Sequence, residues 1–210
     1  MEWIVQLPIL FFAVVVHELA HGIVAYFKGD DTAERMGRLT LNPIPHIDPF
    51  GTVMLPLFCY LAHLPMFAWA KPVPVSAHRL NHPRRDLLQV ALVGPGSNLT
   101  MALTAAVLFK LVSLAAAFGG AFQQTLLDAL IFAVNINLFL AFFNLLPIHP
   151  LDGSQVLSNL LPEPWRGRYE RHIPYGMFIL MFLIMTRLVN SWVVVPSRFI
   201  LEAFSRIGLL

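Results

Sequence analysis

The stretch His17-Glu18-Leu19-Ala20-His21 combines residue types that can hold a metal ion and move a proton. Residues four apart lie on one face of a helix, so both imidazoles can reach one ion at the usual zinc–nitrogen distance of about 2.0–2.1 Å. Glu18 lies about 100° further round such a helix, outside the ligand set but near enough to accept a proton from a water on the metal. The spacing predicts a zinc site with His17 and His21 as ligands and Glu18 as base.

The segment that carries this motif, about Trp3 to Phe27, is long and apolar enough to cross a bilayer. Ionisable side chains are costly in lipid, and their usual role there is functional. Two core histidines with a snorkelling glutamate are the alternative, but the motif lies too far inside the apolar run for snorkelling. Because only about 9 Å of helix follows His21, the site should lie inside the membrane, nearer the end where Lys28 emerges.

Composition agrees with a membrane protein. The chain is 57% hydrophobic and 12% charged, whereas soluble domains carry about 25% charged residues. Its 210 residues predict one helical domain, residues 1–210, in contact with the lipid bilayer. A net charge of +2 without a basic run argues against a nucleic-acid partner. The single Cys59 excludes an internal disulfide framework and a cysteine-rich metal site.

Further apolar segments predict an all-α polytopic bundle of about four to six membrane segments. They lie at about residues 87–118, 125–146 and 173–188. Residues 50–68 contain Gly51, Pro56 and Pro65 and would form either a short span or a re-entrant hairpin. A hairpin would put the site on the same side of the membrane as the loops that follow, whereas a span would put residues 28–50 outside. Basic residues mark those following loops as cytoplasmic. These residues are Lys71, Arg79, Arg84, Arg85, Arg166, Arg168 and Arg171.

Between the first two segments, alternation from Arg38 to Asn42 predicts a short β-strand or hairpin element near residues 37–43, ended by Pro43. His46 and Asp48 could form a second metal pair. A polar turn is favoured there, because Asp48 precedes Pro49.

A third zinc ligand is expected where a later helix breaks. Pro147 and Pro150 cannot sit in an unbroken helix, so the segment at 125–146 should stop and continue at residues 151–161. Asp152 lies in this break between apolar neighbours and is the favoured third ligand, although Asp before Gly is also a common turn pair. Asp128 and His149 are the competing candidates.

Asn144, just before the break, could donate its amide to a substrate carbonyl or to the oxyanion formed there. The alternative is an interhelical hydrogen bond, which is the role favoured for Asn137.

Together these motifs resemble the site-2 protease family of intramembrane zinc metalloproteases. Three carry the resemblance: His17-Glu18-x-x-His21, Gly94-Pro95-x-x-Asn98, and Asn144-Leu145-Leu146-Pro147 followed by Leu151-Asp152-Gly153. Residues 37–43, 46–49 and 69–74 are similar to its short prokaryotic branch, and no insertion is large enough for a PDZ or CBS domain. His149 is a departure, since proline is usual there.

The resemblance implies that His17, His21 and Asp152 bind one zinc ion, that Glu18 is the catalytic base, and that Asn144 steadies the substrate. It implies cleavage of a single-span membrane protein within or near its transmembrane segment, as in regulated intramembrane proteolysis. The substrate would lie extended against the strand at 38–42. In that family the first helix enters the cytoplasm at its carboxyl end, which favours the hairpin for residues 50–68 and places the site nearer the cytoplasmic face of a cell membrane.

Two other classes can use similar ligands. A zinc transporter or storage protein would need no glutamate beside the ligands, and the paired halves common in transporters are not evident. A membrane metalloprotease with glutamate as third ligand would not need Asp152.

Overall fold

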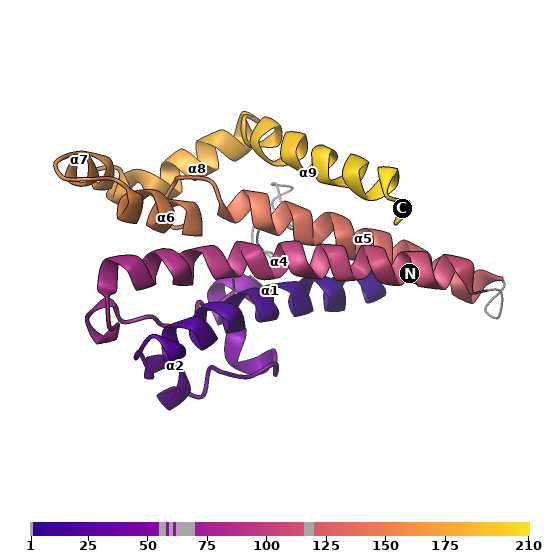
Figure 1. Ribbon diagram of the computed structural model, residues 1–210, viewed down its shortest axis with the longest axis horizontal. Coiled ribbons are helices and arrows are strands. Elements are labelled where there is room, and N and C mark those ends of the chain that lie inside the picture. The colour runs from indigo at the N-terminus through magenta and orange to yellow at the C-terminus, as the bar shows by residue number, and fades with distance from the viewer. Residues whose placement is uncertain (1, 55–57, 59–60, 62–69, 116–119) are drawn as a thin grey trace.

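Three long helices form the body of the protein. The computed structural model describes residues 2–54, 58, 61, 70–115 and 120–210. Within them, α1 (Glu2–Phe27), α4 (Pro83–Leu114) and α5 (Ala121–Asn144) pack against one another (Figure 1). The shorter helices are α2 (Thr32–Arg35), α6 (Asp152–Leu160), α7 (Trp165–Glu170), α8 (Gly176–Met185) and α9 (Val189–Arg206). Single turns occur at Ile44–His46, Pro49–Met54, Ala77–Arg79 and Ile173–Tyr175.

The long helices are those able to cross a membrane. Helices α1, α4 and α5 have the necessary length and hydropathy, and α7–α8 with α9 form a pair bent by 70° that counts as one more candidate. The described residues therefore provide three spans, or four if the bent pair is one span. Four is the lower end of the predicted range of four to six. The predicted hairpin, residues 50–68, lies mostly outside the described residues. The protein is a multi-pass membrane protein.

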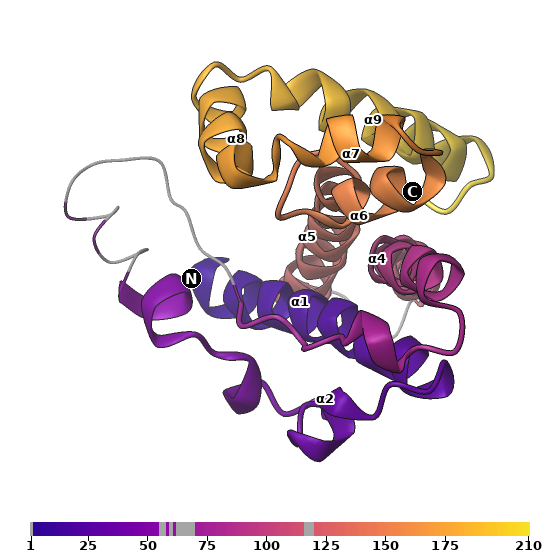
Figure 2. The same ribbon diagram turned by 90° about the vertical axis from the view of Figure 1, so that its left-hand side faces the viewer.

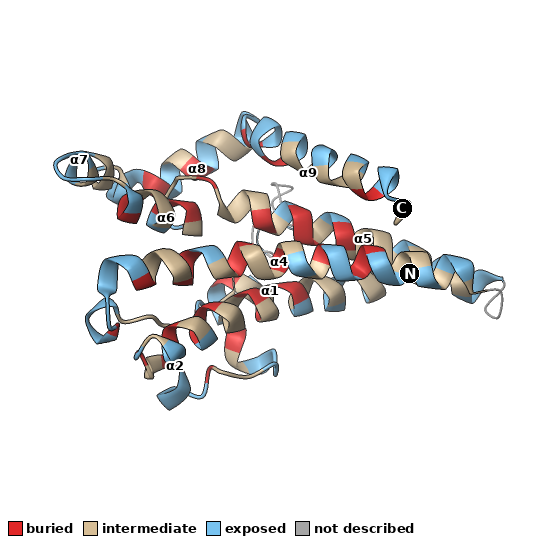
Figure 3. Cartoon of the chain, viewed as in Figure 1, coloured by how far each residue is buried: buried red, intermediate tan, exposed pale blue. Residues whose placement is uncertain are grey.

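Helix α4 is central because its small side chains allow close approach. Ala102, Ala105 and Ala106 are buried against Leu138 of α5 and Phe204 of α9. Small residues at such contacts are typical of helices packed in membranes. Figure 3 shows the buried stripes where the long helices meet and the exposed outer faces. Helices α6 to α9 lie on the opposite side of α4 and α5 from α2 (Figures 1 and 2).

The predicted helix break is confirmed. Helix α5 ends at Asn144 and α6 begins at Asp152, with Pro147 and Pro150 in between, where proline cannot continue a helix. The connection folds closely over the first turn of α6, because a Cβ on Gly153 would lie 2.2 Å from a backbone oxygen of the connection. The close contact explains why glycine follows Asp152.

The other end of α6 is held by Arg84, in the first turn of α4. Its Nε donates to Asn159 O at 2.9 Å and its Nη2 to Leu161 O at 2.6 Å. The last carbonyls of a helix lack partners within it, and a basic side chain satisfies them well. Both ends of α6 are therefore tied to the rest of the bundle.

Residues 37–43 do not form the predicted strand; they are a run of bends. Asn42 N donates to Thr40 Oγ1 and Ile44 N donates to Asn42 Oδ1, each at 3.1 Å. Thr40 O also lies 3.0 Å from His46 Nε2. Such local bonds occupy backbone groups that a strand would need, so polar side chains override the alternating pattern. The predicted edge for a substrate is absent from these residues.

Asp48 forms the polar turn that the sequence favours. Its Oδ1 accepts hydrogen bonds from Phe50 N at 3.0 Å and Gly51 N at 2.6 Å. His46 is buried, and its ring contacts the loop through Thr40 O. No metal cluster involves these two residues within the described part of the chain.

Candidate metal centre

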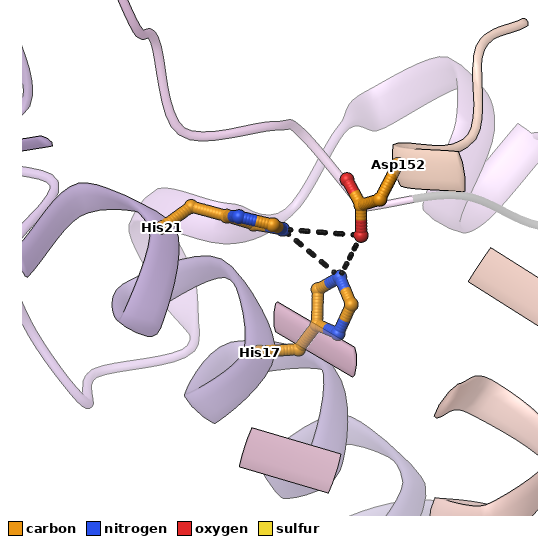
Figure 4. Close-up of side chains that lie close together, drawn as sticks. All are labelled: His17, His21 and Asp152. Carbon is orange, nitrogen blue, oxygen red and sulfur yellow. Dashed lines mark hydrogen bonds and ion pairs between the residues drawn. The ribbon is translucent and has the colours of Figure 1, made fainter. Parts of the chain in front are cut away.

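Two imidazoles from α1 and one carboxylate from α6 meet at a buried point (Figure 4). His17 and His21 lie one helical turn apart, and their Nε2 atoms are 3.1 Å from each other. Asp152 Oδ2 lies 3.0 Å from His17 Nε2 and 3.3 Å from His21 Nε2. The ligand atoms of a tetrahedral zinc ion with bonds of about 2.0–2.1 Å are about 3.4 Å apart. The three distances therefore fit the base of such a site.

A chain of amides determines which nitrogen of His17 carries the proton. Asn137 Nδ2 donates to Ala133 O at 2.9 Å, and that carbonyl can only accept. Asn137 Oδ1 therefore faces Asn98, whose Nδ2 donates to it at 2.9 Å. Asn98 Oδ1 then faces His17 Nδ1 at 2.6 Å. His17 Nδ1 must be the donor, and in the neutral ring the lone pair is then on Nε2.

His21 is held in the same tautomer by the backbone of α4. Its Nδ1 lies 2.7 Å from Val90 O, which can only accept, so Nδ1 carries the proton. Hydrogen-bonding the outer nitrogen in this way is the usual means of orienting a metal-binding imidazole. Both Nε2 atoms therefore offer lone pairs.

The donor set fits a cation. Both Nε2 atoms and Asp152 Oδ2 are able to donate an electron pair to a metal ion. Asp152 Oδ2 is buried and has no hydrogen-bond partner among the described residues. A carboxylate and two neutral imidazoles brought this close in a buried place are stabilised by a positive ion, and two histidines with one carboxylate suit zinc. Within the described residues, His17, His21 and Asp152 form the one group able to hold a metal.

Gly94 of α4 makes room for the two rings. A Cβ there would lie 2.4 Å from His21 Nε2 and 2.7 Å from His17 Cε1. Real Cβ atoms do not approach other atoms so closely, so only glycine allows α4 to pass this close to the histidines.

Glu18 does not join the cluster. Its Oε2 accepts a hydrogen bond from Val73 N at 2.8 Å, which fixes the carboxylate on a neighbouring face of α1. Glu18 therefore lies beside the group of three donors and outside it.

The remaining candidates lie elsewhere. Asn144 is the last residue of α5, and its Nδ2 donates to Leu140 O of its own helix at 3.0 Å. Asp128 is exposed and bonded to Gln124 at 2.8 Å. His149 lines a small polar cavity beside α7. Neither Asp128 nor His149 belongs to the metal group.

Sequence reasoning missed three contributors: Gly94 and Asn98 at the rings, and Val73 at Glu18. The first two belong to the Gly-Pro-x-x-Asn motif, which marked a family resemblance without indicating a contact. Asn137 was expected to make an interhelical hydrogen bond, and it does, but to the residue that orients His17.

A multi-pass helical bundle with a buried His-His-Asp group defines a class of membrane metalloenzymes, and comparison with known proteins narrows it. A model of peptidase family M50 matches residues 110–186. "Putative zinc metalloprotease YwhC" of Bacillus subtilis is 40% identical over 185 residues, covering 86% of this chain and 80% of the relative. No solved structure matches significantly.

Two mycobacterial relatives are more distant. "Putative zinc metalloprotease Rip2" of Mycolicibacterium smegmatis is 29% identical over 84% of this chain, and that of Mycobacterium tuberculosis is 30% identical over 84%. The chain spans 65% of the length of each. This chain belongs to peptidase family M50, the site-2 protease family, and is a zinc metalloprotease of that type.

Proposed function

We propose that this protein hydrolyses a peptide bond within or near the transmembrane segment of a single-span membrane protein, as in regulated intramembrane proteolysis. One zinc ion per chain is held by His17, His21 and Asp152. The observation that carries the proposal is the convergence of His17 Nε2, His21 Nε2 and Asp152 Oδ2, which lie 3.0–3.3 Å from one another. Residues 1–210 act as a single catalytic domain.

Zinc held at this site would supply an activated water and would polarise the substrate carbonyl. Glu18 accepts the proton of that water and returns it to the leaving amine. Asn98 Oδ1 and Val90 O accept hydrogen bonds from the two Nδ1 atoms and so turn both Nε2 atoms toward Asp152. Asn144 uses one amide hydrogen within α5 and offers the other to the substrate's carbonyl oxygen.

The site faces the cytoplasmic side of the cell membrane in this proposal. The start of α4 and helix α7 lie at the same end of the bundle (Figure 1), and Arg84 joins that start to the end of α6. Arg166 and Arg168 of α7 add positive charge at that end. Loops rich in arginine and lysine remain cytoplasmic.

Glu18→Gln tests this function. Purified wild type and variant are compared for zinc per chain and for cleavage of a generic single-span substrate in detergent micelles. The variant should keep about one zinc and lose cleavage by about 10²–10⁴-fold, the usual contribution of a general base. A variant that cleaves like wild type would contradict the role of Glu18, and a protein that only transports or stores zinc would show no cleavage in either form.

Asp152→Asn tests the ligand set, with Asp128→Asn as the matched control. The first should lose zinc and the second should keep it, because Asp128 is exposed and remote from the imidazoles. Unchanged metal content in Asp152→Asn would exclude Asp152 as the third ligand and would favour a protease that uses glutamate there.

A further inference from the structure

An extended segment, residues 70–76, lies against α1 beside Glu18; we call it the strap. Its residue Val73 is 7% exposed. Val73 N donates to Glu18 Oε2 at 2.8 Å, although the two residues are 55 positions apart. The partner of this carboxylate is therefore a backbone group from a different part of the chain.

The prolines of the strap leave the Val73 N–H without a neighbouring backbone donor. Pro72 and Pro74 flank Val73, and proline has no N–H, so residues 72–74 contain one backbone donor. A residue before proline is also restricted to extended conformations. The strap is therefore stiff at Val73, and its single N–H has a defined direction.

Gly22 explains how the strap comes so close to α1. It lies one turn after Glu18, on the same face of the helix. A Cβ at Gly22 would lie 2.9 Å from Val73 Cγ1 and 2.6 Å from Leu39 Cδ2. The side chain of Val73 thus fills the space over Gly22 while its N–H reaches Glu18.

Both ends of the strap are anchored. Lys71 N donates to His46 O at 2.9 Å. Ser76 N donates to Asp30 Oδ2 at 2.5 Å, and the fully buried Asp30 is itself held by Thr32 N at 3.0 Å. These anchors fix the position of the N–H independently of Glu18.

We propose that the strap positions the catalytic base: the Val73 N–H holds Oε2 of Glu18 and leaves Oε1 for proton transfer. This inference rests on the proposed function. A hydrogen bond to an ionised carboxylate is among the stronger ones, and a glutamate has three side-chain torsions that would otherwise vary. Val73 is a positioning residue, acting only through its backbone.

Val73→Pro removes the N–H and suits an extended chain between prolines, whereas Val73→Ala keeps the N–H and removes only packing. With the single-span substrate used above, Val73→Pro should lower kcat about 10- to 100-fold with KM and zinc content unchanged. Val73→Ala should keep at least about half of the wild-type kcat, because the donor is intact. Equal losses in the two variants would overturn the proposal, as would a wild-type kcat in Val73→Pro.

Amide hydrogen exchange gives a test that needs neither activity nor a proline. Residues 72–74 contribute one exchangeable amide, so mass spectrometry of peptides covering the strap resolves Val73. In Glu18→Ala this amide should exchange at least about tenfold faster than in wild type, because its acceptor is gone. The amide of Ser76, held by Asp30, should stay protected and serves as the internal control.

Unchanged exchange at Val73 in Glu18→Ala would overturn the proposal. If Val73→Pro misfolds and loses zinc, the exchange experiment alone decides the question. Failure of the proposed function looks different: wild type would lack zinc, or Glu18→Gln would remain active, whatever the exchange at Val73.

Discussion

Gly94→Ala should disrupt zinc binding through a single added methyl group. Ordinary contact begins at 3.4 Å, whereas the new Cβ would lie 2.4 Å from His21 Nε2 and 2.7 Å from His17 Cε1. Either the rings move by about 1 Å or α4 moves away. Zinc distances tolerate only about ±0.2 Å, so the required shift exceeds that tolerance several times. We expect zinc affinity to fall by at least about 10- to 100-fold, the usual cost of disturbing the groups that orient a metal ligand.

Gly96→Ala is the matched control. It lies two residues further along the same helix, and a Cβ there meets nothing within 4 Å. Both variants replace glycine by alanine next to Pro95, so they share any change in helix propensity. Zinc affinity is measured by competition with a chelator of known affinity. Equal affinity in the two variants would refute the argument that the absence of a side chain at position 94 makes room for the histidines.

Two other perturbations follow from the structure. Asn98→Ala removes the acceptor that holds His17 Nδ1 and should weaken zinc binding about 10- to 100-fold; chelator competition measures this, and a change under twofold would contradict the orienting role. Asp30 is buried, which acts to raise its pKa, but the hydrogen bonds from Ser76 and Thr32 outweigh burial and hold the pKa below its ordinary value of 3.8. The stabilisation that a lowered pKa gives is fully present when the pH is above the pKa of the unfolded state. It is lost as the pH falls through the pKa of the folded state. The melting temperature of wild type should therefore fall from about pH 5 toward pH 3 more steeply than that of Asp30→Asn, and parallel curves would contradict this.

The parts of the site that sequence predicted depend on local geometry. Residues four apart share a helix face wherever the helix lies in a protein, so the spacing of His17 and His21 alone predicts a pair of ligands. Asp152 was identifiable because two prolines forced a helix to stop beside an acidic residue. The break and the long apolar helices follow from the same short-range rules of chain stereochemistry and hydropathy.

The missed parts depend on tertiary contact. Asn98 is 81 positions from His17, and Val73 is 55 positions from Glu18. No periodicity connects residues so far apart, and an asparagine in a membrane helix can serve many partners. The prediction of a strand at 37–43 was wrong for a different reason. Thr40 and Asn42 form hydrogen bonds with nearby backbone groups that a strand would need, and the alternation of side chains in the sequence gives no sign of these bonds.

The order in which the ribosome delivers the ligands limits when this enzyme can act. His17 and His21 emerge early, but the carboxylate at position 152 is synthesised roughly ten seconds later at usual translation speeds. A nascent chain therefore cannot hold a complete hydrolytic centre while its first helices enter the membrane. Proteolytic competence is gained only after α6 docks.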